Sequence, residues 1–437
     1  MKTPLLACLV VLCACGSSPS SNSALAEAKS SVVRDLAPTV SSADTSALIA
    51  ANESFSFDMY GQLKAKAGNV FFSPLSLAEA LTMLNAGANG QTKTEIEAML
   101  HANTLSGDSA LFSAWDSLDL TLASYNQVPD AAGADGKPFQ LAVANGLFGQ
   151  HDLTFEQPFL DTLAGNFGAG VYLVDFINNP AGAETEINQW GSYHTDGAIP
   201  QVLPPGTINS TDRLVLANAV YFSAGWQQVF SANDTSPATF TRLDGSTVSV
   251  PLMNQLASFP YAAGAGYQAI SLPYSVAING KNDLSMIVVM PSAGTFSTFE
   301  STFTATQFET IRASLAPTQV MLSLPKVKLD TGSMDLSANL EALGMVTAFS
   351  GAADFSGITT KIPLQVASVI QEATLDVAES GTVAAAVTVV VIETGAVAEP
   401  PTYVTMTINQ PYLVFLYDAQ TQTILFQGRI VDPSSAQ

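Results

Sequence analysis

The side chains that could do covalent chemistry are few, and their spacing matches no catalytic motif. Histidine occurs only at His101, His151 and His194. A Ser-His-Asp enzyme needs a histidine beside an activated serine, yet the chain has no Gly-x-Ser-x-Gly nucleophile elbow. It also has no His-Glu-x-x-His motif, no phosphate-binding loop and no Gly-x-Gly-x-x-Gly after a predicted strand. We therefore expect that the chain is not an enzyme and that it needs no metal or cofactor.

All three cysteines lie at the N-terminus, at Cys8, Cys13 and Cys15. Lys2 precedes an apolar run from 5 to 12 that is too short to span a bilayer and is typical of a signal peptide. The run ends in Leu-Cys-Ala-Cys-Gly, which resembles a bacterial lipobox with Cys15 as the acylated residue. The alternative is an ordinary signal peptide that contains cysteines by chance.

The lipobox interpretation divides the chain into three parts. Residues 1–14 would be a lipoprotein signal peptide, 15–46 a lipidated tether, and 47–433 one folded domain without thiols or disulfides. Stable anchoring takes more than one acyl chain, which fits a multiply acylated Cys15. Gly16 and Ser17 are not aspartate, so retention at the inner membrane is not signalled. We predict a secreted protein, lipid-anchored to the outer membrane or cell surface of a bacterium.

The composition favours a folded, acidic protein. Hydrophobic residues make up 47% of the 437 residues and charged residues 12%, which is unlike a disordered chain. The formal net charge is −22, and no cluster of lysine and arginine interrupts it. We therefore expect no nucleic acid or other polyanion as a partner.

The order of predicted secondary-structure elements indicates an α+β fold, with helices early in the chain and strands late. Ser73 and Pro74 predict a capped helix start, followed by Leu77, Leu81 and Leu84 at helical spacing. Thr92 to Glu95 has the form of a second capping box. Short apolar runs predict buried strands, namely 213–222, 285–290, 319–324 and 413–417.

One late segment has an unusual composition. From Thr382 to Ile392 every residue is Thr, Val, Ala or Ile, with no charge and no proline. In a strand, alternate residues share a face, so Thr382, Ala384, Ala386, Thr388, Val390 and Ile392 would lie together. Such a segment suits insertion into an existing sheet, because proline would break the ladder and inward charges would oppose burial. Composition alone also allows an ordinary buried strand.

Blocks along most of the chain resemble the serpin family and occur in the family's order. They cover about 47 to 432 and include 69–76, 87–92, 187–190, 195–197, 216–222, 324–326, 343–345, 353–358, 409–412 and 424–429. The resemblance implies an α+β fold with three β-sheets, about nine helices and an exposed reactive-centre loop at about 379–403. It also implies a suicide inhibitor that forms a covalent complex with a target serine protease.

The resemblance assigns roles within the loop. Its hinge would comprise Glu379, Gly381, Thr382, Ala384, Ala385, Ala386 and Thr388. Seventeen residues counted inclusively from Glu379 end at Gly395, which places the reactive bond at Gly395–Ala396, or one or two residues away. No Arg or Lys is near, so we expect an elastase- or subtilisin-like target that prefers small residues. The alternative is a non-inhibitory serpin acting as a surface binding or scaffold protein.

Two supporting clusters are also implied by the resemblance. Ser73, Ser76 and Asn218 match the family's shutter beneath the main sheet, where Gln371 stands in place of the usual histidine. Glutamine preserves hydrogen bonding but does not titrate, so no pH-sensitive opening is expected there. Trp226 matches the aromatic at the breach, where the loop enters the sheet. Ordinary core packing is the alternative for all five. No basic stripe matches the family's glycosaminoglycan-binding helix, and we expect a monomer.

Overall fold

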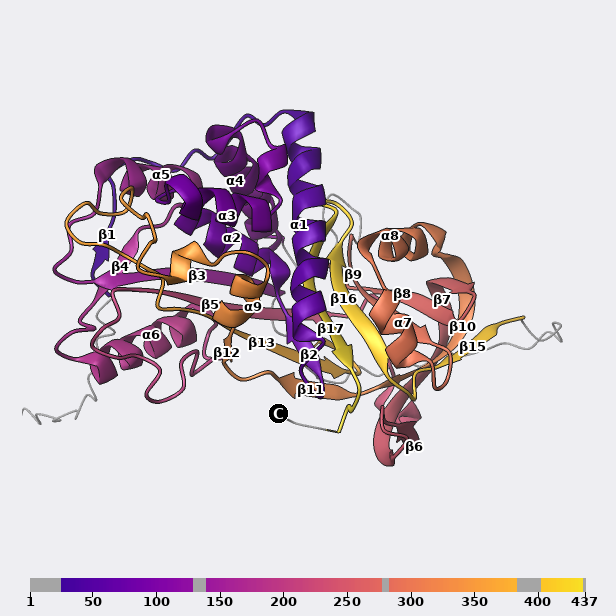
Figure 1. Cartoon of the computed structure of the whole chain (residues 1–437). Coiled ribbons are helices and arrows are strands. Elements are labelled where there is room, and N and C mark those ends of the chain that lie inside the picture. Colours follow the sequence, from indigo (N-terminus) through magenta and orange to yellow (C-terminus); the bar gives the residue numbers. More distant parts are fainter. Residues whose placement is uncertain (1–24, 129–138, 277–282, 383–401, 435–437) are drawn as a thin grey trace, which may run out of the picture.

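Two β-sheets form the framework of the computed structural model, which describes residues 25–128, 139–276, 283–382 and 402–434 (Figure 1). The sheet that we call the main sheet has eight strands. Their order is β1 (Glu27–Ala28), β4 (Val171–Val174), β3 (Gln140–Gln150), β5 (Leu214–Gly225), β14 (Gly381–Thr382), β13 (Ser368–Ala378) and β11 (Val327–Asp330), and β12 (Met334–Asp335) also pairs with β13.

The second sheet has nine strands that form one continuous ladder. Their order is β15 (Val404–Thr407), β10 (Ala316–Pro325), β7 (Thr247–Gly264), β8 (Tyr267–Pro273), β9 (Leu284–Pro291), β16 (Tyr412–Asp418), β17 (Thr423–Ile430) and β2 (Val70–Phe72), with β6 (Ser236–Thr241) beside β7. The 18-residue β7 pairs with β6 over residues 247–252, with β10 over 252–261 and with β8 over 261–264. The second and third of the three expected sheets are therefore joined through β7.

Nine α-helices occur in the described part of the chain and cover the sheets. They are α1 (Ser42–Leu63), α2 (Pro74–Asn85), α3 (Gly90–Met99), α4 (Asp108–Tyr125), α5 (Gln157–Phe167), α6 (Pro180–His194), α7 (Phe296–Thr302), α8 (Ala305–Ser314) and α9 (Ser337–Ala342). All twelve residues of α2 are buried, and this helix contacts β3, β5 and β17. The smaller core cluster joins Ile187 and Trp190 of α6 to Val215 and Ala217 of β5. The main sheet is thus enclosed between α2 and α6.

The predicted α+β class is confirmed, and the four predicted strands appear as β5, β9, β10 and β16. The predicted cap at Ser73 is also confirmed, because its side chain accepts a hydrogen bond from the Ser76 amide at 3.3 Å. The capping box from Thr92 to Glu95 is wrong, since α3 begins at Gly90. The Thr92 hydroxyl accepts instead from the Asp354 amide at 2.9 Å, a contact that no local pattern reveals.

Residues 25–41, the described part of the chain before α1, lie against the domain. β1 pairs antiparallel with β4, and the Leu173 amide donates to the Ala26 carbonyl at 2.8 Å. Further along, Arg34 binds Asp116 at 2.7 Å and Asp119 at 2.6 Å, both on α4. The described part of the predicted tether, residues 25–46, therefore adds an edge strand and an ion-pair cluster, and it ends inside α1.

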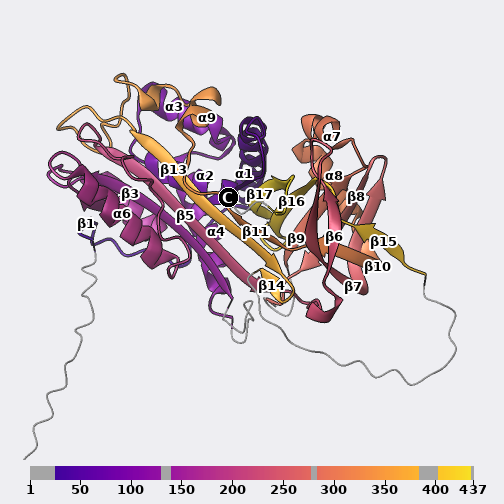
Figure 2. The same ribbon diagram turned by 90° about the horizontal axis from the view of Figure 1, so that it is seen from below.

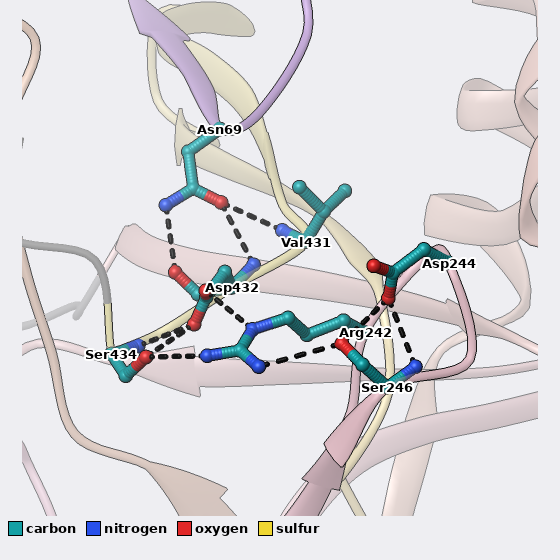
Figure 3. Close-up of polar contacts among 7 residues, drawn as sticks. All are labelled: Asn69, Arg242, Asp244, Ser246, Val431, Asp432 and Ser434. Carbon is teal, nitrogen blue, oxygen red and sulfur yellow. Dashed lines mark hydrogen bonds and ion pairs between the residues drawn. The ribbon is translucent and has the colours of Figure 1, made fainter. Parts of the chain in front are cut away.

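The C-terminal end is held from two sides, as Figure 3 shows. Asn69, which precedes β2, accepts hydrogen bonds from the amides of Val431 and Asp432 at 2.8 and 3.0 Å. Arg242, which follows β6, binds the Asp432 carboxylate at 2.5 Å and the Ser434 hydroxyl at 3.2 Å. These contacts connect the end of β17 to both β2 and the β6–β7 hairpin.

Candidate functional site

The candidate site lies between β5 and β13 of the main sheet, and the predicted loop hinge begins directly after β13. Residues 368–373 of β13 pair directly and in parallel with 215–220 of β5. Beyond that stretch, β14 lies between the two strands and is antiparallel to both. Gly381 is opposite Gly225 and Ala378, and Thr382 is opposite Ala224 and Val377. Figure 2 shows β5 and β13 side by side, with β14 at one end of the pair.

Gly381 fits this position because it has no side chain. Its φ is +153°, and a Cβ on it would lie 2.2 Å from the carbonyl oxygen of Ala224. Any other residue would therefore force β14 away from β5. The predicted hinge glycine is the residue at which the chain turns into the sheet.

Thr382 shows which face of the hinge points inward. It is 1% exposed, and its hydroxyl lies 3.0 Å from the Tyr274 hydroxyl. The Tyr274 ring stacks on Trp226 with centroids 4.7 Å apart, and the Trp226 indole donates to the Ala378 carbonyl at 2.9 Å. Burial raises the pKa of Tyr274, so its phenol stays neutral and can donate. Trp226 therefore lies beside the hinge strand, at the predicted breach.

Glu379 fixes the turn that joins β13 to β14. Its carboxylate accepts from Lys326 Nζ at 2.7 Å and from the Thr235 hydroxyl at 2.9 Å. Partial burial acts to raise the pKa of Glu379, but the Lys326 contact and the other hydrogen bonds leave it below the ordinary value. The first hinge residue is thus an ionised anchor that joins the turn to Lys326, between β10 and β11.

The four predicted shutter residues lie together beneath the main sheet. Gln371 of β13 accepts from the Ser73 amide at 2.9 Å and donates to the Ser73 carbonyl at 3.0 Å. It also donates to Asn218 Oδ1 of β5 at 2.6 Å. Asn218 in turn donates to the Ser76 hydroxyl. The cluster therefore ties β5 and β13 to each other and to the start of α2.

Two further residues extend this cluster, and sequence reasoning missed both. Asn145 of β3 accepts from the Ser76 hydroxyl at 3.0 Å and donates to the Glu79 carboxylate at 2.8 Å. Burial, reinforced by the nearby charge of Asp119, raises the pKa of Glu79 well above its ordinary value. Asn145 alternates with Leu141 and Leu147 on one face of β3, and a polar residue on an apolar face was the available signal.

Several predicted site residues lie outside the described residues. They are Cys15, Ala384, Ala385, Ala386, Thr388, Gly395 and Ala396. Within the described residues, no group of three or more His, Cys, Asp or Glu could hold a metal ion. The helices in those same ranges include none that is long and apolar enough to cross a membrane.

The structure is an α+β fold in which β14, a short strand from the C-terminal part of the chain, lies between the two central strands of the main sheet. The family model described as serpin (serine protease inhibitor) matches residues 50–433, and the chain belongs to the serpin family.

Relatives cover nearly the whole chain. An uncharacterized serpin-like protein of Thermococcus kodakarensis is 35% identical, over 88% of this chain and 86% of its own. Human serpin B4 is 33% identical and bovine leukocyte elastase inhibitor 32%, over 88% of this chain and 98% and 99% of theirs. The crystal structure of human kallistatin has a TM-score of 0.75 at 27% identity, over 89% of this chain and 99% of that one. The native thermophilic serpin tengpin has a TM-score of 0.79 over 93% and 99%, and at 24% identity it shows the fold alone.

Proposed function

We propose that this protein inhibits a serine protease by inserting its own cleaved loop between β5 and β13. The observation that carries the proposal is the register of β14, whose two residues already pair with both strands. A strand that continues in this register would separate residues 368–373 of β13 from 215–220 of β5. Each backbone group that lost its present partner would gain one from the new strand, so the ladder would be kept.

The continued register places small residues where space is limited. Ala384 would lie opposite Phe222 and Leu375, and Ala386 opposite Val220 and Ala373. These four partners are fully or almost fully buried. Alanine adds little volume between them, and it loses no side-chain entropy on burial. The composition of the hinge thus matches the face that it would meet.

The same register places the next hydroxyl at the shutter. Thr388 would lie opposite both Asn218 and Gln371, whose mutual hydrogen bond now closes the sheet. Insertion must break that 2.6 Å bond, and a threonine hydroxyl can both donate and accept in its place. A buried polar pair therefore stays hydrogen-bonded, which avoids the cost of leaving it unsatisfied.

The target would be a protease that accepts small residues. In the mechanism that the family implies, the protease serine attacks the Gly395 carbonyl, the amine of Ala396 leaves, and the acyl-enzyme is carried along as the loop inserts. The bait segment has Gly, Ala, Val and Thr around the bond and no Arg or Lys. Two kinds of support favour an elastase-like target, namely this composition and the similarity to leukocyte elastase inhibitors.

The protein would act at a bacterial surface, attached through acylated Cys15. Leu25 packs against the smaller core cluster, and Glu27 and Ala28 pair with β4 at the edge of the main sheet, so only residues 16–24 would separate acylated Cys15 from the folded domain. A fully extended chain of nine residues reaches about 30 Å. The domain would therefore stay close to the membrane, with the β1 edge nearest to it.

The experiment tests whether the protein traps a serine protease in a covalent complex. The mature domain is incubated with pancreatic elastase, with subtilisin and with a broad panel of serine proteases, and the mixtures are run on denaturing gels. We expect a complex that survives SDS with at least one small-residue protease, together with cleavage near Gly395. Clean cleavage without a complex across the whole panel would favour the second candidate, a non-inhibitory serpin that acts as a binding protein.

A further inference from the structure

Arg213 differs from the other arginines of the chain in its partners. The other four, Arg34, Arg242, Arg312 and Arg429, each pair with a carboxylate. Arg213 has no carboxylate partner in the described part of the chain. Its Nη1 donates to the carbonyls of Ser210 and Asp212, at 2.9 and 2.6 Å. A guanidinium carries five N–H donors, so Arg213 retains donors for a further acceptor.

Arg213 lies at the end of the main sheet that is opposite to β14. It directly precedes β5, and Val366 and Ala367 directly precede β13. All three line an open groove of about 720 Å³, together with Glu341 of α9. The last backbone hydrogen bond between the starts of β5 and β13 is donated by the Ala367 amide to the Leu214 carbonyl, at 3.0 Å. An inserted strand would leave the sheet at this groove.

The register of β14 predicts which loop residue reaches the groove. Continued without a bulge, it places Ile392 opposite Leu214 and Ala367. The next residue, Glu393, then lies opposite Arg213 and Val366. Directly opposite residues of an antiparallel pair point to the same face, with Cβ atoms about 5 Å apart. Glu393 is also the only charged residue between Thr382 and Ala398.

We propose that Arg213 is the receiving site for the Glu393 carboxylate after the loop has inserted, so that this ion pair latches the end of the new strand. The inference rests on the proposed inhibitory function and adds the position at which insertion stops. Glu393 precedes Gly395 by two residues, or about 7 Å of extended chain. The latch would therefore hold the strand directly before the residue that is bonded to the protease.

A disulfide pair tests the position. In the full chain, with Cys8, Cys13 and Cys15 replaced by Ser, Arg213→Cys is combined with Glu393→Cys. Opposite residues of an antiparallel pair have Cα atoms 4.5–5.5 Å apart, which suits a disulfide. After cleavage by elastase or subtilisin, both cysteines lie in the N-terminal fragment, so mild oxidation should close a loop within that fragment and speed its migration on a non-reducing denaturing gel. The uncleaved protein should not cross-link. The control pair, Arg213→Cys with Thr394→Cys, points to opposite faces and should link much less.

The ion pair itself is tested by a double-mutant cycle on the cleaved protein in urea, which does not screen charges. Arg213→Gln and Glu393→Gln should each raise the unfolding rate about 2- to 5-fold, as for a partly exposed pair. The double variant should be no faster than the faster single variant. Glu341→Gln lies in the same groove and should show no coupling to Glu393→Gln.

The outcomes separate this inference from the proposed function. Insertion itself is measured by the gain in urea stability when the wild-type loop is cut. If that gain occurs but 213 and 393 neither cross-link nor couple, the latch is overturned and the inhibitory function stands. If cleavage brings no gain in stability, loop insertion is overturned, and the latch with it.

Discussion

The side-chain amide of Gln371 donates a 2.6 Å hydrogen bond to Oδ1 of Asn218, and this bond joins β13 to β5 where the proposed loop insertion would open the main sheet. Both residues are buried, and Gln371 also exchanges two hydrogen bonds with the backbone of Ser73. Opening the sheet therefore disrupts a polar cluster that has no access to water. The cluster holds the sheet closed only while each of its members keeps a partner.

Gln371→Leu should destabilise the native protein by about 2–4 kcal/mol. The substitution keeps the volume roughly constant but leaves the amide and carbonyl of Ser73 and the Oδ1 of Asn218 without this partner. Urea unfolding of the uncleaved protein measures the loss. Thr374→Val, at a half-buried position of the same strand, should change stability by less than about 1 kcal/mol. Equal effects of the two substitutions would contradict the role of the cluster.

Glu372 should make the native state less stable as the pH rises towards 7. It is 4% exposed on β13, opposite Ala219 of β5, and its Oε2 has no hydrogen-bond partner within the described ranges. Burial, with a contribution from Asp330, raises its pKa to about 7. The folded protein therefore holds a proton that the unfolded chain loses near its ordinary pKa, and stability falls between about pH 4.5 and pH 7.

Glu372→Gln should remove that part of the pH dependence. The variant should be more stable than the wild type at pH 8, by about 2 kcal/mol, and similar to it at pH 4. Unfolding midpoints in urea at a series of pH values give the comparison. A variant that keeps the wild-type slope between pH 4.5 and 7 would show that another group causes it.

Arg34→Met should weaken the attachment of the N-terminal segment. Asp116 is fully buried. Its Oδ1 pairs with Arg34, and its Oδ2 has no hydrogen-bond partner within the described residues. Loss of Arg34 leaves a buried carboxylate without its counter-charge. Because Arg34 itself is 20% exposed, we expect a cost of about 1–3 kcal/mol, below that of a wholly buried pair.

Thermal unfolding of the native protein measures this cost. Combining Arg34→Met with Asp116→Asn should recover part of the loss, because the buried charge is then absent. Lys93→Gln breaks an exposed pair with Asp108 and serves as the control, with an expected change of less than about 0.5 kcal/mol. A larger loss from the control than from Arg34→Met would rule out this account of the segment.

The sequence predicted the parts of the site that follow a repeated pattern. The inward face of the hinge was predicted from strand alternation, and Thr382 is buried as expected. The shutter residues came from the family resemblance, and the structure brings all four together.

What the sequence did not predict depends on contacts between distant segments. The approach of Ala224 to Gly381 and the addition of Asn145 and Glu79 to the shutter cluster are tertiary contacts without local periodicity. β1 has two residues, too few to show an alternating pattern. The false capping box at Thr92 has the same cause, since its hydroxyl is engaged by Asp354 from a remote loop.

The most direct test of loop insertion compares two arginine substitutions at adjacent hinge positions. Thr382→Arg forces a charge into the buried site beside Tyr274. Val383→Arg would lie on the other face of the new strand, where the register places it opposite Asp376, which is partly exposed, and Ser223, which is buried but uncharged. The measurement is the fraction of protease trapped as SDS-stable complex at equal concentrations. The account predicts that Thr382→Arg is cleaved as a substrate with little complex, whereas Val383→Arg still traps protease. Undiminished trapping by Thr382→Arg would contradict it.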